Sequence, residues 1–99
     1  MNKYEEIDKG LAEWASRHSL VWLTDHQGSE VRTFFLRPES KEKVQIWVDP
    51  PKNGHVNVHV FQYKLGGKKK NAEDVSCKIT DLVKALDEVL NTANKWLSL

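Results

Sequence analysis

The sequence has few of the features that mark membrane, secreted or disulfide-linked proteins. Its single cysteine is Cys77, so no disulfide can form within the chain, and this agrees with a reducing compartment. The longest uninterrupted apolar run is four residues, from Leu20 to Leu23. The opening stretch MNKYEEIDKG is charged, which argues against a membrane span and a secretory signal. We therefore expect a cytoplasmic protein without a membrane partner.

An imbalance of charge is also missing. The chain has 15 Lys and Arg residues against 14 Asp and Glu residues, so its net charge of +1 creates no overall field toward nucleic acid, membranes or acidic substrates. The sequence lacks a glycine-rich phosphate loop, a Cys-x-x-Cys pair and a paired-carboxylate motif, and we expect no cofactor. With 99 residues, the chain is predicted to form one domain, residues 1–99, around a single core.

Two stretches near the ends of the chain have the spacing of amphipathic helices. Over residues 3–18, side chains that suit a core recur at steps of three and four, namely Tyr4, Ile7, Leu11, Trp14 and His18. A wider apolar stripe near the C-terminus contains Leu82, Val83, Leu86, Val89, Leu90, Ala93 and Leu97. Thr80 is a natural N-cap for this second helix, and Asp81 suits the positive end of its dipole.

The residues between the two helices are typical of antiparallel strands. β-Branched and aromatic residues are enriched over residues 20–25, 31–37, 44–49 and 55–63. The segment HQGSE joins the first pair of strands as a hairpin, and PPKNG joins the last pair. We expect GGKKKNAED, residues 66–74, to be a loop. The alternation of Val75, Cys77 and Ile79 then predicts a short fifth strand, in which Cys77 is buried and inert.

These elements predict an α+β fold. The order is α-β-β-β-β-(β)-α, with a four- to five-stranded antiparallel sheet and the N- and C-terminal helices packed on one face. Within the segment HVNVHVFQY, residues 55–63, Val56, Val58 and Val60 suit the covered face. Placing Asp49 opposite His55 pairs Val48 with Val56, Ile46 with Val58, and Val44 with Val60. The same register places Trp47 opposite Asn57 and Gln45 opposite His59 on the other side of the sheet.

The odd-numbered side of this segment is the first candidate for a binding surface. It combines aromatic, imidazole and amide groups, and we centre the candidate site on Trp47, Asn57, His59, Phe61 and Tyr63. Tyr and Trp are enriched in protein interfaces because they bury much area at little cost in rotamer entropy. The sequence therefore favours a small binding or adaptor module that contacts a protein partner or forms a homodimer.

A lysine cluster supports an alternative binding function. Lys68, Lys69 and Lys70 follow the glycine pair Gly66 and Gly67. A basic segment beside aromatic side chains offers phosphate attraction together with stacking surfaces, which single-stranded nucleic-acid binders require. The simpler interpretation is a solvated turn that discourages edge-to-edge aggregation.

The four histidines favour neither a metal site nor a complete catalytic site. His55 and His59 lie four residues apart, but in a strand this spacing separates them by about 13 Å, too far to share an ion. An enzyme that uses Asp49 with His55, or Asp25 with His26, is a third alternative. Since no Ser or Cys nucleophile accompanies either pair in the sequence, we favour a binding protein over an enzyme.

Overall fold

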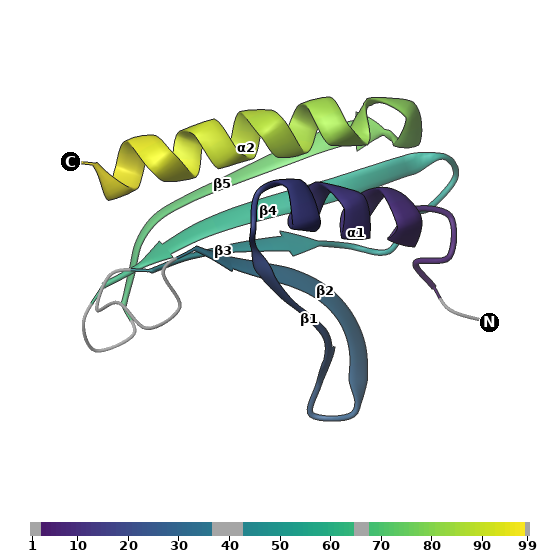
Figure 1. Cartoon of the computed structure of the whole chain (residues 1–99), viewed down its shortest axis with the longest axis horizontal. Coiled ribbons are helices and arrows are strands. Elements are labelled where there is room, and N and C mark those ends of the chain that lie inside the picture. The colour runs from purple at the N-terminus through teal and green to yellow at the C-terminus, as the bar shows by residue number, and fades with distance from the viewer. Residues whose placement is uncertain (1–2, 37–42, 65–67, 99) are drawn as a thin grey trace.

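A computed structural model describes residues 3–36, 43–64 and 68–98. Five antiparallel strands form an open sheet in the order β1-β2-β3-β4-β5, so each strand pairs with its neighbour in the sequence (Figure 1). Both helices lie on the same side of this sheet, and the predicted α+β fold is confirmed. The elements are α1 (Asp8–Arg17), β1 (Val21–His26), β2 (Ser29–Leu36), β3 (Lys43–Val48), β4 (His55–Tyr63), β5 (Lys69–Lys78), a 3₁₀ helix (Ile79–Asp81) and α2 (Leu82–Leu97).

The N-terminal helix is shorter than its apolar pattern predicts. Regular helix begins at Asp8, because residues 3–7 form turns in which the carbonyl of Tyr4 accepts hydrogen bonds from the amides of Ile7 and Asp8. Tyr4 and Ile7 are nevertheless buried, like Leu11 and Trp14 in the helix itself. The prediction for His18 was wrong, since it caps the helix as an exposed residue. The inward-facing side chains are therefore almost as predicted, although the first of them reach the core from turns.

The C-terminal helix also begins later than expected. Thr80 is not its N-cap, because residues Ile79–Asp81 form a 3₁₀ turn between β5 and α2. Asp81 occupies the N-cap position without a side-chain capping hydrogen bond. The helix packs on β3, β4 and β5 and also touches α1. Its buried positions are Leu82, Ala85, Leu86, Val89 and Ala93, so most of the predicted stripe faces the sheet, whereas Val83 is exposed.

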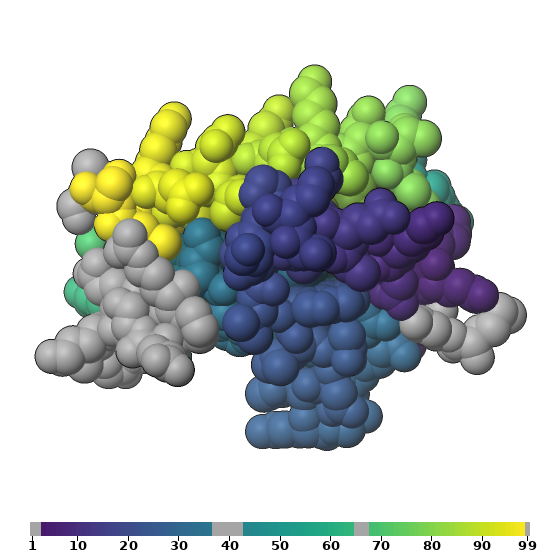
Figure 2. All heavy atoms as spheres, viewed as in Figure 1, coloured from purple at the N-terminus to yellow at the C-terminus, as the bar shows by residue number. Residues whose placement is uncertain are grey.

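Two-residue turns determine how the strands pair. Gln27 and Gly28 both have positive φ, as do Asn53 and Gly54, and this is the requirement of the tight hairpin turns that match strand twist. The first turn is thus shorter than HQGSE, and its ends become part of β1 and β2. Figure 2 shows the end of this hairpin projecting beyond the helix layer.

The predicted register of β3 and β4 was wrong by two residues, although the two faces were assigned correctly. Val48 pairs with Val58, Ile46 with Val60, and Val44 with Gln62. The Asn53-Gly54 turn is closed by a bridge between Lys52 and His55, so the two prolines lie on the β3 side of the turn and shift the pairing. Because a shift of two preserves the alternation of side chains, the valines still face the core.

Gln62 fills the place of a core residue at the end of β4. It is fully buried, and its Oε1 accepts a hydrogen bond of 2.6 Å from Nδ2 of Asn71. Its Nε2 donates to the carbonyl of Trp96 at 3.4 Å. Burial of a side-chain amide is tolerated when both its donor and its acceptor atoms find partners. Gln62 therefore links β4 with β5 and with the end of α2.

The fifth strand is much longer than predicted. Residues 69–74, which we expected in a loop, belong to β5 and pair with the full length of β4, with an irregularity beside Gln62 and Tyr63. Gly66 and Gly67 lie outside the described residues. Cys77 is half-buried against the core, and burial, with a smaller effect of the Asp81 charge, raises the pKa of its thiol. A raised pKa leaves little reactive thiolate.

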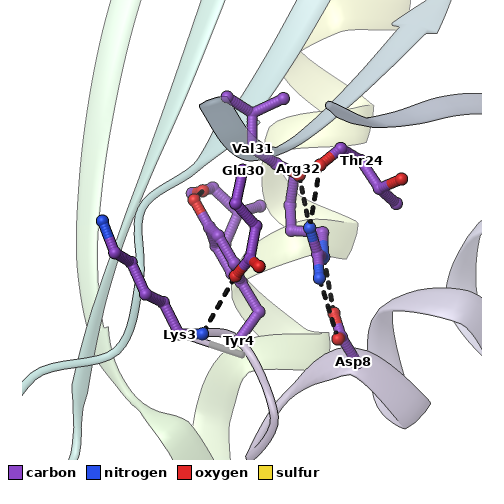
Figure 3. A network of polar contacts seen from close by, with 8 residues as sticks. Lys3, Tyr4, Asp8, Thr24, Glu30, Val31 and Arg32 are labelled. Atoms are coloured by element: carbon purple, nitrogen blue, oxygen red, sulfur yellow. Dashed lines mark hydrogen bonds and ion pairs between the residues drawn. The ribbon is translucent and has the colours of Figure 1, made fainter. Parts of the chain in front are cut away.

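An ion pair between a buried arginine and a partly exposed aspartate attaches the first helix to the sheet (Figure 3). The guanidinium of Arg32 in β2 donates to both carboxylate oxygens of Asp8, at 2.6 and 2.9 Å. It also donates to the carbonyls of Thr24 and Val31 and lies 4.4 Å above the ring of Tyr4. This side chain is only 5% exposed. The pair therefore fixes the start of α1 against the first hairpin.

Candidate interaction face

The side of the sheet opposite the helices is called the open face here. Directly paired residues share a face, so the register places side chains in rows across the strands. The first central row contains Val21, Phe35, Gln45, Phe61 and Ala72. The second central row contains Leu23, Thr33, Trp47, His59 and Asp74. These two rows form the middle of the open face.

The structure places all five residues of the predicted aromatic and polar site on the open face. Four of them are half-buried, and the fifth, Asn57, is exposed; the half-buried residues are Trp47, His59, Phe61 and Tyr63. Phe61 stacks against the imidazole of His59, with ring centroids 6.2 Å apart, and lies 6.3 Å from the ring of Tyr63. Successive odd-numbered residues of β4 therefore form a continuous line of rings along the strand.

The first hairpin adds an apolar half to this face that the sequence had left undetermined. Val21 and Leu23 of β1 are 57% and 42% exposed, which makes them two of the most exposed large apolar residues described. Phe35 lies between Val21 and Gln45 and is half-buried. The sequence could have predicted this position, because Phe34 and Leu36 enter the core and Phe35, between them, must face the other side. The open face thus carries apolar side chains on four neighbouring strands.

Two of the three predicted lysines, Lys69 and Lys70, lie in β5 and not in the predicted loop. Lys69 pairs with Tyr63, and Tyr63 pairs with Lys43 on its other side. The ammonium of Lys69 lies 4.5 Å above the ring of Phe61. Lys70 follows in β5, and Lys68 precedes the strand, where its carbonyl accepts a hydrogen bond from Lys64. Lys43 and Lys69 are called the basic end of the open face below.

A carboxylate, an imidazole and a second carboxylate meet at the second central row and the row beyond it, on the side away from the lysines. The Nε2 atom of His59 is 2.7 Å from Oδ2 of Asp49, and its Nδ1 atom is 2.6 Å from Oδ1 of Asp74. Burial tends to lower the pKa of His59, but the hydrogen bonds and charges of the two carboxylates outweigh it and leave the pKa raised. A protonated ring donates to both carboxylates, whereas a neutral ring has a single N–H. Asp49 and Asp74 are called the acidic end below.

The structure pairs Asp49 with His59 and not with His55, as one of the predicted catalytic pairs required. Asp49 bonds to His59, while the Nδ1 atom of His55 lies 3.1 Å from the carbonyl of Asn53. Asp25 accepts a hydrogen bond from the amide of Gly28 within the first turn. Because carboxylates occupy both ring nitrogens of His59, the imidazole offers no free lone pair to a substrate. Sequence reasoning missed this cluster because it placed Asp74 in a loop and shifted the β3–β4 register.

The cluster predicts a pH-dependent contribution to stability. Replacing His59 by Gln is expected to lower the free energy of unfolding by about 1–2 kcal/mol near pH 5 to 6, because two charge-assisted hydrogen bonds are lost. Since the folded pKa is raised, the advantage of the native protein is complete below pH ~6.5 and is lost as pH rises through the folded pKa. Urea unfolding at a series of pH values measures this difference.

Replacing His55 by Gln is the matched control for this experiment. His55 lies on the same strand and the same histidine-to-glutamine change applies, but its ring is exposed and contacts a backbone carbonyl. We expect this control to change the unfolding free energy by less than about 0.5 kcal/mol. An equal pH dependence in the two variants would refute a special role for the carboxylate cluster.

Neither a metal-holding cluster nor a membrane-spanning helix is found among the described residues. Within residues 3–36, 43–64 and 68–98, no group of three or more His, Cys, Asp and Glu side chains is placed to hold a metal ion. In the same part of the chain, no helix has the length and apolar character needed to cross a membrane. Comparisons of the chain with protein-family models, with curated proteins and with solved structures found no match.

Proposed function

We propose that this protein is a binding module that uses the open face to contact another protein. The observation that carries the proposal is the apolar patch on the face opposite the helices, formed by Val21, Leu23, Phe35, Trp47 and Phe61. Contiguous apolar area on a surface is typical of interaction sites, and aromatic side chains are enriched at interface centres. Polar and charged side chains border the patch, as they do at the rim of many interfaces.

Single-stranded nucleic acid is the second candidate ligand, and a specific observation favours it. At the basic end, Lys69 lies over Phe61, and Tyr63 follows on the same strand. Such an arrangement suits a stacked base and its phosphate. Asp49 and Asp74 on the same face repel phosphate, and the aliphatic Val21 and Leu23 offer no ring for stacking. A protein partner can contact the aliphatic and acidic side chains as well as the aromatic ones, so it accounts for more of the open face.

Lysine-specific cross-linking in the cells that produce the protein tests this proposal. Lys43 and Lys69 report on the open face, while Lys84 and Lys95, which are exposed on α2, report on the helix layer. We expect intermolecular cross-links to other protein chains to come mainly from Lys43 and Lys69. They are expected to fall at least about tenfold when Leu23 and Phe61 are both replaced by Ser, because the apolar centre is lost.

The matched control replaces Val83 by Ser. Val83 is 40% exposed on α2, almost the same fraction as Leu23, but it lies on the opposite layer of the molecule. The Val83→Ser variant should form the same cross-links at Lys43 and Lys69 as the unmodified protein. Cross-links concentrated at Lys84 and Lys95 would contradict the proposal. Ultraviolet cross-links to RNA at Phe61 or Tyr63, with no protein cross-links at Lys43 or Lys69, would favour the nucleic-acid alternative.

A further inference from the structure

We propose that the partner of the open face is a second copy of this chain, bound face to face about a two-fold axis that runs across the strands. This inference rests on the proposed function, because it names the partner of the same surface. Two sheets that pack in this way interdigitate their side chains about 10 Å apart, as in a sandwich. A two-fold arrangement also uses one surface twice and forms a closed assembly.

The distribution of charge selects this arrangement. The basic end, Lys43 and Lys69, and Asp49 of the acidic end are separated along the strands by up to about 20 Å, because six residue steps lie between Lys43 and Asp49. An axis across the strands reverses their direction and places Lys43 of each copy over Asp49 of the other. Asp74 lies one row closer to the centre, and Lys78, which pairs with His55, lies one row beyond Asp49 on the same face. An axis along the strands would place lysines over lysines. The charges therefore favour the first orientation and oppose the second.

The acidic end retains its charge when His59 is protonated. Two carboxylates then surround one imidazolium, so the cluster keeps a net negative charge toward Lys43 and Lys69 of a second copy. Asp74 is the more accessible carboxylate, with a side chain that is 74% exposed. Asp49 is the carboxylate that the rotation places over Lys43 of the second copy, and Asp74 lies one row away from that contact.

The apolar middle is self-complementary under the same rotation. The axis keeps β1 over β1 and β4 over β4, because only the direction of the strands is reversed. Val21 and Leu23 of one copy then meet the same pair in the other, and the rings of Phe61 and Trp47 fall near the centre. The most exposed apolar residues of the open face are thus removed from water together.

The size of the face places it at the low end of interfaces that form specific dimers. Five strands spaced by ~4.8 Å and six residue steps of ~3.3 Å give a projected area of about 480 Å². Protruding side chains raise the accessible area above this value, toward the ~800 Å² that each partner of a standard interface buries. We expect a dimer with a dissociation constant on the order of micromolar.

Sedimentation velocity of the purified chain, from about 1 μM to about 1 mM, tests the proposal because this range spans a micromolar dissociation constant. We expect a monomer-dimer equilibrium for the unmodified protein and for Val83→Ser. The double variant Leu23→Ser with Phe61→Ser should remain monomeric throughout, with its circular dichroism unchanged. Dissociation should increase with salt, since charge pairs at the rim are screened.

A charge-reversal experiment tests whether both charged ends of the open face lie in the interface. Lys43→Glu with Lys69→Glu gives a face with two acidic ends, and Asp74→Lys with Ser76→Lys gives a face dominated by basic groups. Ser76 is exposed and pairs with Asn57, so it points to the open face. Each variant alone is expected to dimerise at least about tenfold more weakly, and their mixture should form a heterodimer within about threefold of the native affinity.

Three results would overturn the inference. They are a monomer at every concentration, a dimer that Leu23→Ser with Phe61→Ser leaves intact, and a mixture of the two charge variants that fails to associate. The second result would place the contact elsewhere, for example at the edge strand β5. If the chain is monomeric but Lys43 and Lys69 still cross-link to other proteins in cells, this inference fails while the proposed function stands. If neither experiment detects contacts at the open face, both the homodimer and the proposed binding function are refuted.

Discussion

Replacing Arg32 by alanine is expected to lower the free energy of unfolding by about 3 kcal/mol. The guanidinium of Arg32 is almost fully buried and is shared between Asp8, two backbone carbonyls and the ring of Tyr4. Removing the guanidinium abolishes two charged hydrogen bonds to Asp8, whose side chain is 28% exposed, and the hydrogen bonds to two backbone carbonyls. The loss of packing against Tyr4 adds to this effect. Chemical denaturation measures the difference at neutral pH.

A double-mutant cycle separates the ion pair from the packing. We expect Asp8→Ala to be destabilising as well, and the double variant to be less destabilised than the sum of the two by about 2 kcal/mol. Arg17→Ala is the control, because Arg17 is exposed in the last turn of α1 and should contribute less than about 0.5 kcal/mol. Strict additivity of Arg32→Ala and Asp8→Ala would show that the pair does not act as a unit.

Trp14→Ala is expected to be the most destabilising single substitution in α1, by about 3–5 kcal/mol. The indole is fully buried and meets the ring of Phe34 edge to face, with centroids 5.3 Å apart. Its Nε1 atom donates to Oδ1 of Asp87 at 3.0 Å. The side chain therefore joins α1, the sheet and α2 in one place. A domain of this size has only about 5–15 kcal/mol of stability, so this variant should unfold at much lower urea concentration.

Two further variants distinguish the cavity from the hydrogen bond. Trp14→Phe keeps an aromatic ring against Phe34 but removes the donor to Asp87, and we expect it to cost about half as much as Trp14→Ala. Trp96→Ala is the matched control for a tryptophan that is only partly buried, and it should cost about 1–2 kcal/mol. The assignment of Trp14 to the core would be wrong if Trp14→Ala proved no more destabilising than Trp96→Ala.

The order of the elements and the covered face of the sheet were predictable because they depend on local alternation. A valine at every second position of residues 56–60 requires one buried face whatever the exact pairing. For the same reason, the aromatic side of β4 was correctly assigned to the open face. Alternation alone also assigned the polar residues Asn57 and His59 to the open face. Prediction therefore succeeded wherever the face of a residue depended only on its position in an alternating strand.

Prediction failed where a long-range partner decides the conformation. Residues 69–74 have a polar, lysine-rich sequence typical of a loop, but the free edge of β4 offers them a ladder of backbone hydrogen bonds. The same reasoning explains the cluster around His59, since Asp49 and Asp74 reach it from two different neighbouring strands. The buried Arg32 was missed because an arginine within a strand sequence carries no sign of the carboxylate that approaches from α1.

The sheet in which every strand pairs with its sequence neighbour has a consequence for folding during synthesis. Each hairpin closes a short loop, so the sheet can form step by step from β1 to β5 as the chain emerges from the ribosome. The helix that covers β3, β4 and β5 comes last, and until it arrives the valines of β3 and β4 remain exposed to water and to other nascent chains. The moment of greatest aggregation risk therefore falls just before residues 82–97 are complete.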